Sequence, residues 1–320
     1  MTATQLLNAR PIQLILGLLI LFGAISCIFT PNYFFFKMGA RFAGLLMLGY
    51  LALGLVFLLL RQPRLMFLSF GCCAGLCLFL KNSSNSLLKA PARNNQLSIR
   101  VAHFNVSASD GDFESTLKAI KQSKADLISI QEVTPDWEYI LSESLGEKYP
   151  YSASMVRFDP YGLSIYSKHP IQALDTFYYE EIPNFSGVIK AKRARKSFKF
   201  ICAHTTPPLY SQAYDAMRNH LRVVAAEARR DSLPVVMIAN LIAPPWWAEV
   251  QELRSNAQLF DSRRSATYSL SEVLRSPGDY IFHSAEFNCL SFENIVSPQS
   301  RHLGIKGQYQ FKANAEKTYR

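Results

Sequence analysis

Four apolar stretches of this chain each end in a single polar residue, and a fifth begins with one. Asn105, Glu132, His204 and Asn240 end the four stretches, and Asp279 begins the fifth. Carboxylates bind hard cations, imidazoles exchange protons, and carboxamides donate hydrogen bonds to anionic oxygens. Strand ends and the loops beyond them build the active sites of layered α/β domains, so we expect these side chains to form one site.

Each of these residues taken alone also has an ordinary structural explanation. Glu132 could be a solvated strand end, His204 a histidine at the edge of the core before a proline turn, and Asp279 a turn residue. Their order along the chain, as a set, favours a site. The cysteines add no ligand set, because four of the six lie in the apolar N-terminal part and Cys202 and Cys289 are far apart in sequence.

The elements that must position these residues alternate between strands and helices. Apolar or alternating runs predict strands at residues 97–106, 125–133, 161–171, 197–204, 233–240 and 278–284. Helical spacing of apolar residues predicts helices at residues 112–123 and 213–230. Hairpin-like pairs among the alternating strands and helices favour a mixed α/β sandwich over a simple doubly wound sheet.

Three apolar stretches precede this part of the chain, at residues 12–30, 42–60 and 65–80. A helix needs about 20 residues to cross a bilayer, so the first two are long enough and the third is short. No Asp or Glu occurs before residue 81. We therefore predict that residues 1–80 form a membrane anchor of three transmembrane helices, rather than a buried soluble hairpin or a signal peptide.

Residues 81–96 are rich in Asn and Ser and predict a linker, which is followed by a domain of residues 97–320. Of the 34 Lys and Arg residues, 29 lie beyond residue 80 with all 24 Asp and Glu, a net charge of +5 there. Such a balance suits an anionic substrate or a lipid surface. A raw count of basic residues around the spans favours a cytoplasmic domain, whereas the short turn at 61–64 favours the opposite orientation. Giving the short turn more weight, we expect a bacterial inner-membrane protein with this domain outside the cytoplasm.

The order of several short motifs resembles the endonuclease/exonuclease/phosphatase superfamily of DNase I-like metal-dependent phosphodiesterases, and in particular its membrane-attached bacterial branch. The motifs are HFNV (103–106), LISIQEVTPDW (127–137), YGLSIYSKHPI (161–171), AHTTPP (203–208), PWW (245–247), GDYIFHS (278–284) and SRH (300–302). The resemblance spans about residues 97–312. It implies a four-layer α/β/β/α sandwich.

The resemblance also implies a chemistry, the in-line attack of water on a phosphodiester. It makes Glu132 the ligand of a Mg²⁺ or Mn²⁺ ion, Asn105 the site asparagine that ends the first strand, and His204 a phosphate contact. It pairs Asp279 with His302, the carboxylate orienting the imidazole. The implied partner is a phosphate-containing substrate: a lipid head group, a nucleic acid or a small phosphoester.

Three positions depart from the pattern of this superfamily. Its members carry Gly-Asp-x-Asn where this chain has Ala-Asn-Leu-Ile at 239–242, and Ser-Asp-His where it has Ser-Arg-His at 300–302. Asn240 keeps the shape of Asp but cannot accept a proton, and Ile242 offers no hydrogen bond to a phosphoryl oxygen. Arg301 places a positive charge where a cation would sit, and the two would repel. We therefore expect a phosphodiester hydrolase scaffold whose metal-dependent activity is weakened or lost.

Two other functions are compatible with the same residues. A pseudoenzyme could bind an anionic phosphate-containing ligand or a partner protein through Arg301, His302 and His204, with no metal cofactor. A protein with no selected activity is the second. The hydrolase predicts metal-dependent turnover that Glu132→Gln abolishes, whereas the pseudoenzyme predicts binding of a phosphate ester that needs no divalent ion.

Two further features have competing interpretations. Trp246 and Trp247 are expected to cap the core of the sandwich, and contact with a membrane interface is the alternative. The basic run at residues 190–196 is expected to be a solvated hairpin loop, and contact with phosphate backbones or anionic lipid is the alternative.

Overall fold

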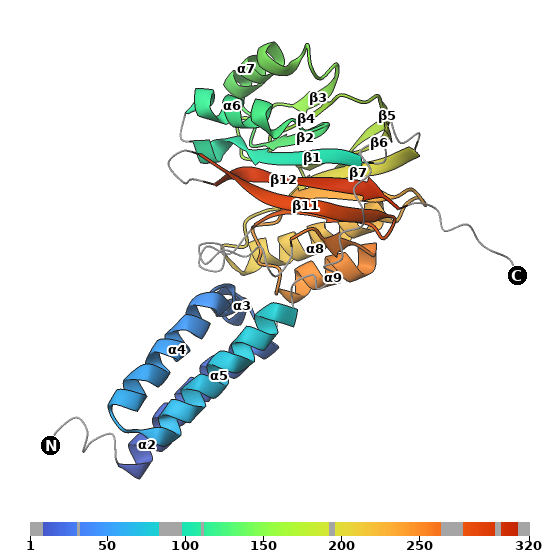
Figure 1. Ribbon diagram of the computed structural model, residues 1–320. Coiled ribbons are helices and arrows are strands. Elements are labelled where there is room, and N and C mark those ends of the chain that lie inside the picture. Colours follow the sequence, from blue (N-terminus) through green and yellow to red (C-terminus); the bar gives the residue numbers. More distant parts are fainter. Residues whose placement is uncertain are drawn as a thin grey trace, which may run out of the picture.

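The computed structural model of the chain describes residues 9–30, 33–82, 98–109, 112–191, 196–263, 278–297 and 302–312, arranged as a helical stem and a layered sandwich (Figure 1). The stem consists of α2 (Arg10–Phe29), α3 (Phe34–Arg41), α4 (Ala43–Leu59) and α5 (Pro63–Asn82). By length and composition α2 and α5 can each cross a membrane, and α3 with α4, which are bent by 65° relative to each other, form either a third, broken span or a re-entrant loop.

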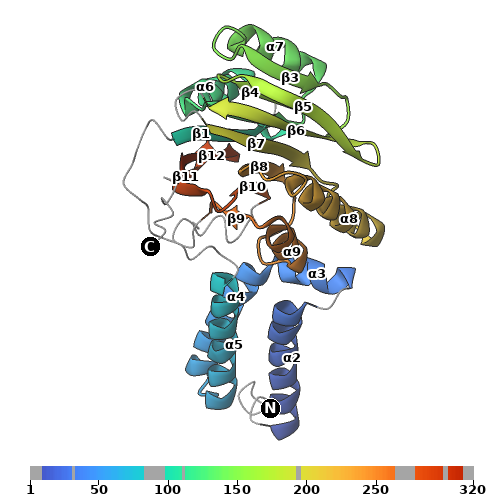
Figure 2. The same cartoon turned by 90° about the vertical axis from the view of Figure 1, so that its right-hand side faces the viewer.

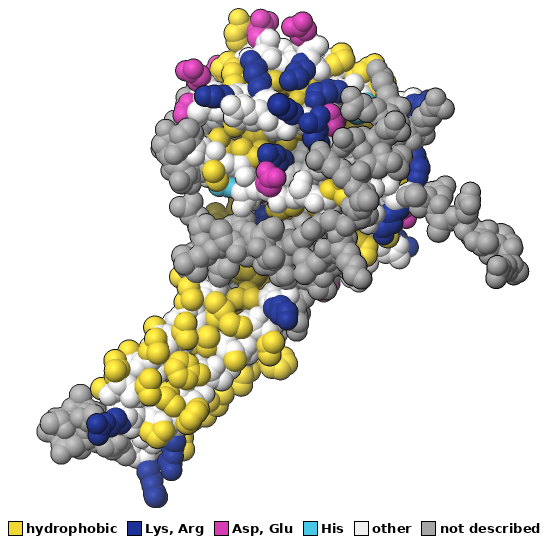
Figure 3. All heavy atoms as spheres, viewed as in Figure 1, with side chains coloured by type: hydrophobic (Ala, Val, Ile, Leu, Met, Phe, Trp, Pro, Cys, Tyr) yellow, Lys and Arg dark blue, Asp and Glu magenta, His cyan; other side chains and the backbone are white. Residues whose placement is uncertain are grey.

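The stem supplies two candidate spans, or the three that were predicted if the bent pair of α3 and α4 counts as one, and two of the predicted spans differ in detail. The span predicted at 42–60 corresponds to α4, but it is preceded by α3, which turns away from it at Phe42. The span predicted to be short, at 65–80, extends over Pro63–Asn82. Figure 3 shows hydrophobic side chains over the visible face of the stem, with Lys and Arg at its far end. Such a large apolar surface would be unfavourable in water and is suited to lipid.

The sandwich contains two sheets, each of six strands within the described part of the chain. The first has the order β11-β12-β1-β2-β4-β3. Its strands are β1 (Ser98–Asn105), β2 (Leu127–Gln131), β3 (Tyr151–Met155), β4 (Leu163–Ser167), β11 (Phe287–Val296) and β12 (His302–Phe311). The second has the order β5-β6-β7-β8-β10-β9. Its strands are β5 (Ile171–Tyr179), β6 (Ile182–Ala191), β7 (Lys196–His204), β8 (Val235–Asn240), β9 (Phe260–Asp261) and β10 (Asp279–His283).

Helices cover the outer face of each sheet, which gives the predicted four-layer α/β/β/α sandwich (Figures 1 and 2). One apolar cluster joins α6 (Phe113–Ser123) and α7 (Pro135–Leu145) to the first sheet. A second fills the space between the sheets. A third joins α8 (Ser211–Ala228) and α9 (Ala248–Ala257) to the second sheet and continues into the stem.

Local signals in the sequence explain where the helices of the first layer begin. The side chain of Asp112 accepts a hydrogen bond from the Ser115 amide at 3.0 Å and caps α6. Thr134 caps α7 in the same way, by accepting from the Trp137 amide. Pro135 lies in the first turn of α7, where backbone N–H groups have no partner within the helix, so the missing N–H of proline is not destabilising. A short 3-10 turn, η2 (Val106–Ser109), links β1 to α6.

The stem meets the sandwich where α3 lies against α9 (Figure 2). Lys37 of α3 is fully buried and its Nζ lies 3.0 Å from Oε1 of Glu249 in α9. The indole Nε1 of Trp246 donates to the Ala40 carbonyl at 2.7 Å. Trp246 and Trp247 are both buried in the third cluster, which confirms that they cap the core, although Trp246 also contacts the stem.

The basic run at 190–196 lies at the turn between β6 and β7. These strands are antiparallel, with Ala191 opposite Lys196. Residues 192–195 of this run are outside the described residues.

Candidate active site

Alternation along β1 places two polar residues at the end of the inter-sheet space. Ile99 and Val101 belong to the cluster between the sheets, whereas Ala102 and Phe104 face α6 and α7. Side chains of a strand alternate between faces, so His103 continues the inward row. Asn105, two residues further on, is the last residue of the strand.

Three of the predicted site residues are immediate neighbours in the second sheet. His204 on β7 lies opposite Asn240 on β8, and Asn240 lies opposite Asp279 on β10. All three follow the inward-facing rows of their strands, which contain Cys202, Val236, Ile238 and Ile281. The two sheets therefore bring these polar strand ends to one end of the sandwich.

Asp279 joins the two sheets through two histidines. Its Oδ2 lies 2.7 Å from Nε2 of His302 on β12, and its Oδ1 lies 3.4 Å from Nε2 of His103 on β1. Burial opposes ionisation of this carboxyl, but the two imidazoles outweigh it and hold the pKa of Asp279 well below its ordinary value. The His302 side chain remains 41% exposed, so a ligand can reach its ring. The predicted Asp279–His302 pair is thus present, with a carboxylate that stays ionised.

His103 is a member of this group that the sequence analysis did not single out. Its side chain is fully buried, and it shares Asp279 with His302. The signal was available in the strand period, because His103 precedes Asn105 by two residues and must share its face.

Asn105 and Glu132 form a second polar pair. Nδ2 of Asn105 donates to Oε1 of Glu132 at 2.5 Å. Oδ1 of Asn105 accepts from the amide and hydroxyl of Ser107, at 3.1 and 3.0 Å, which fixes the orientation of the carboxamide. Glu132 follows β2 with φ of 60°, a left-handed conformation that is unfavourable for a residue with a Cβ. Such strain at a strand end is common at functional sites.

His204 is buried at the centre of the strand ends. Neither ring nitrogen has a hydrogen-bond partner of normal geometry within the described part of the chain, although the Pro160 backbone lies close enough to act on its pKa. Burial lowers the pKa of His204, although the Glu132 carboxylate acts in the opposite direction, so the ring is neutral near pH 7. The ring of Tyr161 lies against it, with 5.5 Å between the ring centroids. A buried neutral imidazole with a nitrogen free of side-chain partners is suited to contact a ligand oxygen.

The segment at the end of β8 is held by hydrogen bonds, although its residues differ from the expected motif. Oδ1 of Asn240 accepts from the Ile242 amide at 3.2 Å, so the carboxamide closes its own turn. Ile242 has φ of 49°, a left-handed conformation that β-branched residues rarely adopt. Thr205 and Gly278 hold the same segment through hydrogen bonds to the Leu241 carbonyl and amide, at 3.0 and 2.8 Å. The third departing residue, Arg301, is outside the described residues.

The donors at this end of the sandwich limit what metal they could hold. In the described ranges no group of three or more His, Cys, Asp and Glu side chains is placed around one metal position. Asp279 already contacts two histidines. The remaining possible metal ligands are the Glu132 carboxylate and the Asn105 carboxamide oxygen, and the second requires rotation of the amide. Mg²⁺ binds through one or two carboxylates and keeps several waters, so this donor set fits one largely hydrated ion.

Comparisons with known proteins agree with this architecture. A model of the Endonuclease/Exonuclease/phosphatase family matches residues 102–302. A structure described as the endonuclease/exonuclease/phosphatase from Bacteroides vulgatus has a TM-score of 0.56 at 16% identity, over 67% of this chain and 99% of that one. One from Beutenbergia cavernae has a TM-score of 0.54 at 15% identity, over 68% of this chain and 72% of that one. TDP2 of D. rerio, complexed with a single-strand DNA product, has a TM-score of 0.53 at 12% identity, over 67% and 99%. No curated protein matches the chain in sequence.

Proposed function

The chain belongs to the endonuclease/exonuclease/phosphatase family, and from that premise we propose that it is a membrane-anchored phosphodiester hydrolase scaffold with weakened metal-dependent activity. The observation that carries the proposal is the convergence of Asp279, its two histidines and the Asn105–Glu132 pair at one end of the two sheets. Members of this family generally depend on a divalent metal and act on phosphate-containing substrates.

The residues would divide the work of binding a phosphate ester as follows. His302, oriented by Asp279, would hold or donate a proton at a phosphoryl oxygen. His204 and Asn105 would hold the remaining oxygens through hydrogen bonds. Glu132 would hold the Mg²⁺ or Mn²⁺ ion, which when bound neutralises charge on the phosphate. Asp279 also keeps His103 in place, which fixes β1 against β10.

The weakening is proposed from the residues that follow β8. An attacking water needs an acceptor for its proton, and the carboxamide of Asn240 cannot take one. Its Oδ1 is already used by the Ile242 amide, so it is also poorly placed to orient the water. Ile242 has no polar group for a phosphoryl oxygen, and Arg301 stands in the sequence where the superfamily pattern has an acidic residue.

The substrate is proposed to lie close to a membrane, as a lipid head group, a nucleic acid or a small phosphoester. Support comes from the apolar stem, whose α2 and α5 are long enough to span a bilayer. We place the protein in a bacterial inner membrane with the sandwich outside the cytoplasm. This orientation puts the dense basic turn at 61–64 on the inner side.

The test uses the full chain in lipid nanodiscs with a generic phosphodiester and Mg²⁺ or Mn²⁺. We expect slow turnover that Glu132→Gln abolishes and that Glu143→Gln, at an exposed position of α7, leaves unchanged. A triple variant with Asn240→Asp, Ile242→Asn and Arg301→Asp should be faster by about 100-fold or more, the usual contribution of a positioned acid or base. Absence of turnover in both the natural chain and the triple variant would refute the proposal.

A second candidate function is a pseudoenzyme that binds an anionic ligand or a partner protein without metal. The observation that favours it is the absence of an acid at Asn240 together with a buried His204 that lies opposite it and has no side-chain hydrogen-bond partner among the described residues. His302 and Arg301 would complete a cationic pocket. This function is supported if inorganic phosphate or a phosphate ester binds equally with and without EDTA while only the triple variant hydrolyses the diester.

A further inference from the structure

The end of the sandwich that carries the candidate site also gathers exposed hydrophobic side chains. Within the described ranges, nine large hydrophobic residues of the sandwich are exposed, and three of these lie on α7, on α8 and in the middle of β5. The other six lie at the strand ends beside the site and are called the apolar rim: Val156, Phe158, Tyr178, Leu209, Tyr210 and Val296. Exposed hydrophobic residues that are scattered singly need no explanation, whereas several gathered at one place mark an interaction surface.

Backbone and side-chain contacts place the first part of the rim beside Glu132. Phe158 is 93% exposed and lies in the turn between β3 and β4. The amide of the residue before it donates to the Val133 carbonyl at 3.2 Å, and Val133 directly follows Glu132. The Tyr178 hydroxyl, from the end of β5, lies 3.8 Å from the sulfur of Met155 at the end of β3. This part of the rim therefore borders the carboxylate proposed to hold the metal.

The rest of the rim borders the histidines of the site. Leu209 and Tyr210 lie between His204, which ends β7, and the first residue of α8. They are 66% and 58% exposed. Val296 ends β11 and lies opposite His302 in the first sheet. A ligand that enters at the strand ends must therefore pass between apolar side chains.

The cations of the sandwich have a different distribution. Arg157, in the turn between β3 and β4, is paired with Asp159, whose Oδ1 lies 2.8 Å from its Nε. Arg100 near the start of β1, Lys168 after β4 and Lys312 after β12 lie at the opposite ends of their strands from the site. A strand of nucleic acid is held by Lys and Arg placed along its backbone. The apolar rim instead favours a phosphate that is joined to an apolar body.

The stem meets the sandwich at this same end. Trp246, whose indole donates to the Ala40 carbonyl of α3, comes six residues after Asn240 at the end of β8. Tyr214, in the first turns of α8, donates to the Glu249 carboxylate that pairs with α3. Both α8 and α9 thus contact the stem close to the strand ends from which they follow. In Figure 1 the stem descends toward the side on which α6 lies, and α6 follows the end of β1.

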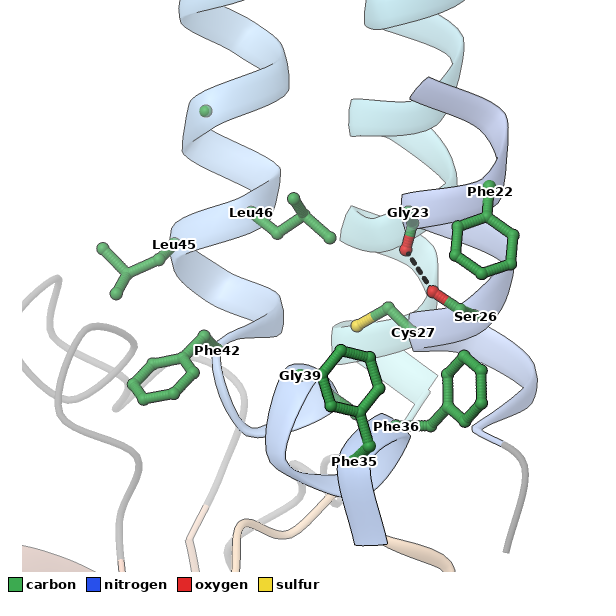
Figure 4. A pocket seen from close by; sticks show the side chains of 12 residues that line it. Phe22, Gly23, Ser26, Cys27, Phe35, Phe36, Gly39, Phe42, Leu45 and Leu46 are labelled. Atoms are coloured by element: carbon green, nitrogen blue, oxygen red, sulfur yellow. Dashed lines mark hydrogen bonds between the residues drawn. The ribbon is translucent and has the colours of Figure 1, made fainter. Parts of the chain in front are cut away.

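Aromatic side chains on the stem indicate the level of the membrane surface. Phe22, Phe35 and Phe36 lie together where α2 meets α3 (Figure 4), with 6.3 and 5.7 Å between the centroids of successive rings. Tyr33, immediately before α3, is 71% exposed. Tyrosine at the end of a membrane span is typical of the boundary between lipid and water. Because α3 packs against the site end of the sandwich, this boundary passes beside the apolar rim.

We propose that the substrate of the candidate site is a membrane phospholipid, and that the apolar rim rests in the bilayer interface while the lipid phosphate enters between the strand ends. The proposal rests on the proposed function, because it names the substrate class of the same site. In the reaction the oxygen of one water bonds to phosphorus, one P–O ester bond breaks, and the released alkoxide takes up a proton. His204 and His302 lie at the entrance that the rim surrounds, where they can contact the phosphate of a lipid that remains in the bilayer.

The first test measures contact between the rim and lipid in the full chain, in nanodiscs of phosphatidylglycerol and phosphatidylcholine. A benzophenone amino acid replaces Phe158 or Tyr210, and mass spectrometry measures the lipid that becomes attached on illumination. The matched control carries the same amino acid at Leu174, which is exposed but lies in the middle of β5, away from the rim. We expect much more attached lipid at the two rim positions than at the control. Equal attachment at all three positions would overturn the proposal.

The second test compares substrates, using the triple variant with Asn240→Asp, Ile242→Asn and Arg301→Asp to obtain measurable turnover. The substrates are phosphatidylglycerol in the nanodisc, a small water-soluble phosphodiester and a single-stranded oligonucleotide. We expect kcat/KM to be highest for the phospholipid. Leu209→Ser should lower the ratio of phospholipid to soluble-diester hydrolysis about tenfold, since burying a leucine side chain is worth about 1.5 kcal/mol or more. Leu174→Ser is the matched control and should leave this ratio unchanged.

The outcomes separate this proposal from the hydrolase proposal. Turnover that favours the oligonucleotide or the soluble diester over the phospholipid would overturn the lipid substrate and leave the hydrolase in place. Equal effects of Leu209→Ser and Leu174→Ser would also overturn it, because the rim would then make no contribution. Absence of turnover with all three substrates would instead refute the hydrolase proposal and, with it, the assignment of a substrate.

Discussion

The ion pair between Lys37 and Glu249 should dominate the attachment of the sandwich to its stem, and Lys37→Met tests this directly. Nζ of Lys37 lies 3.0 and 3.3 Å from the two carboxylate oxygens of Glu249. Their side chains are 0% and 3% exposed. The Tyr214 hydroxyl donates to the same carboxylate, and burial together with this hydrogen bond raises the pKa of Tyr214. The carboxylate is therefore enclosed and depends on these two donors.

The size of the effect follows from distance and burial. Two unit charges at 3.0 Å with an effective dielectric constant of about 20 attract by about 5 kcal/mol. Desolvation offsets much of this gain while the pair is intact. Removing only Lys37 leaves Glu249 charged, buried and short of a donor, which costs about 3–5 kcal/mol. The loss should appear first as undocking of α3 from α9.

Hydrogen exchange of α9 amides in the full chain, in nanodiscs, measures the free energy of this undocking. The matched control is Lys306→Met, because Lys306 and Glu293 are also 3.0 Å apart but are 38% and 59% exposed. An exposed pair is worth about 0–1 kcal/mol. We therefore expect Lys37→Met to lower the protection of α9 strongly, and Lys306→Met to leave the protection of its own strand nearly unchanged.

A double variant separates the ion pair from simple packing. Glu249→Gln added to Lys37→Met removes the uncompensated charge and leaves an acceptor for Tyr214, so it should recover about 2 kcal/mol or more. Equal losses of amide protection in Lys37→Met and Lys306→Met would refute the reasoning. So would a loss in the double variant that equals the sum of the losses in the two single variants. Either result would mean that apolar contacts alone hold α3 to α9.

Two further predictions concern the sandwich. Burial, with a smaller effect of His204, lowers the pKa of His220 to about 4, so the unfolded chain binds a proton that the folded chain does not. The unfolding free energy should therefore fall by about 3 kcal/mol as the pH drops from about 6.5 to 4. Denaturant titrations at several pH values measure this pH dependence, which should be smaller in His220→Gln. Ile242→Asn should raise the unfolding free energy by about 1 kcal/mol, because Asn tolerates the left-handed backbone at this position. Ile295→Asn, at an ordinary φ, should lower the unfolding free energy instead, and a gain at both positions would contradict the argument from strain.

The sequence by itself determined the layered architecture and named most of the residues that the structure brings together at the strand ends. Asn105, His204 and Asn240 were each predicted as the polar end of a strand, and strand ends build the active sites of layered α/β domains. The order of the motifs then predicted the four layers, and the pairing of Asp279 with His302 was predicted from the resemblance. These features depend on the local pattern of apolar and polar residues and on the order of the motifs along the chain, and both can be read from the sequence.

Tertiary structure decided the features that depend on residues far apart in the chain. His103 belongs to the site because β10 of the other sheet brings Asp279 to it. Lys37 is buried because α9 supplies a carboxylate 212 residues away. The chain bends between α3 and α4, where α3 packs against the sandwich. The apolar pattern that predicted this span did not indicate the bend. Hydrophobic period specifies which face of an element is buried, but the partner that covers this face is set only when distant elements pack together.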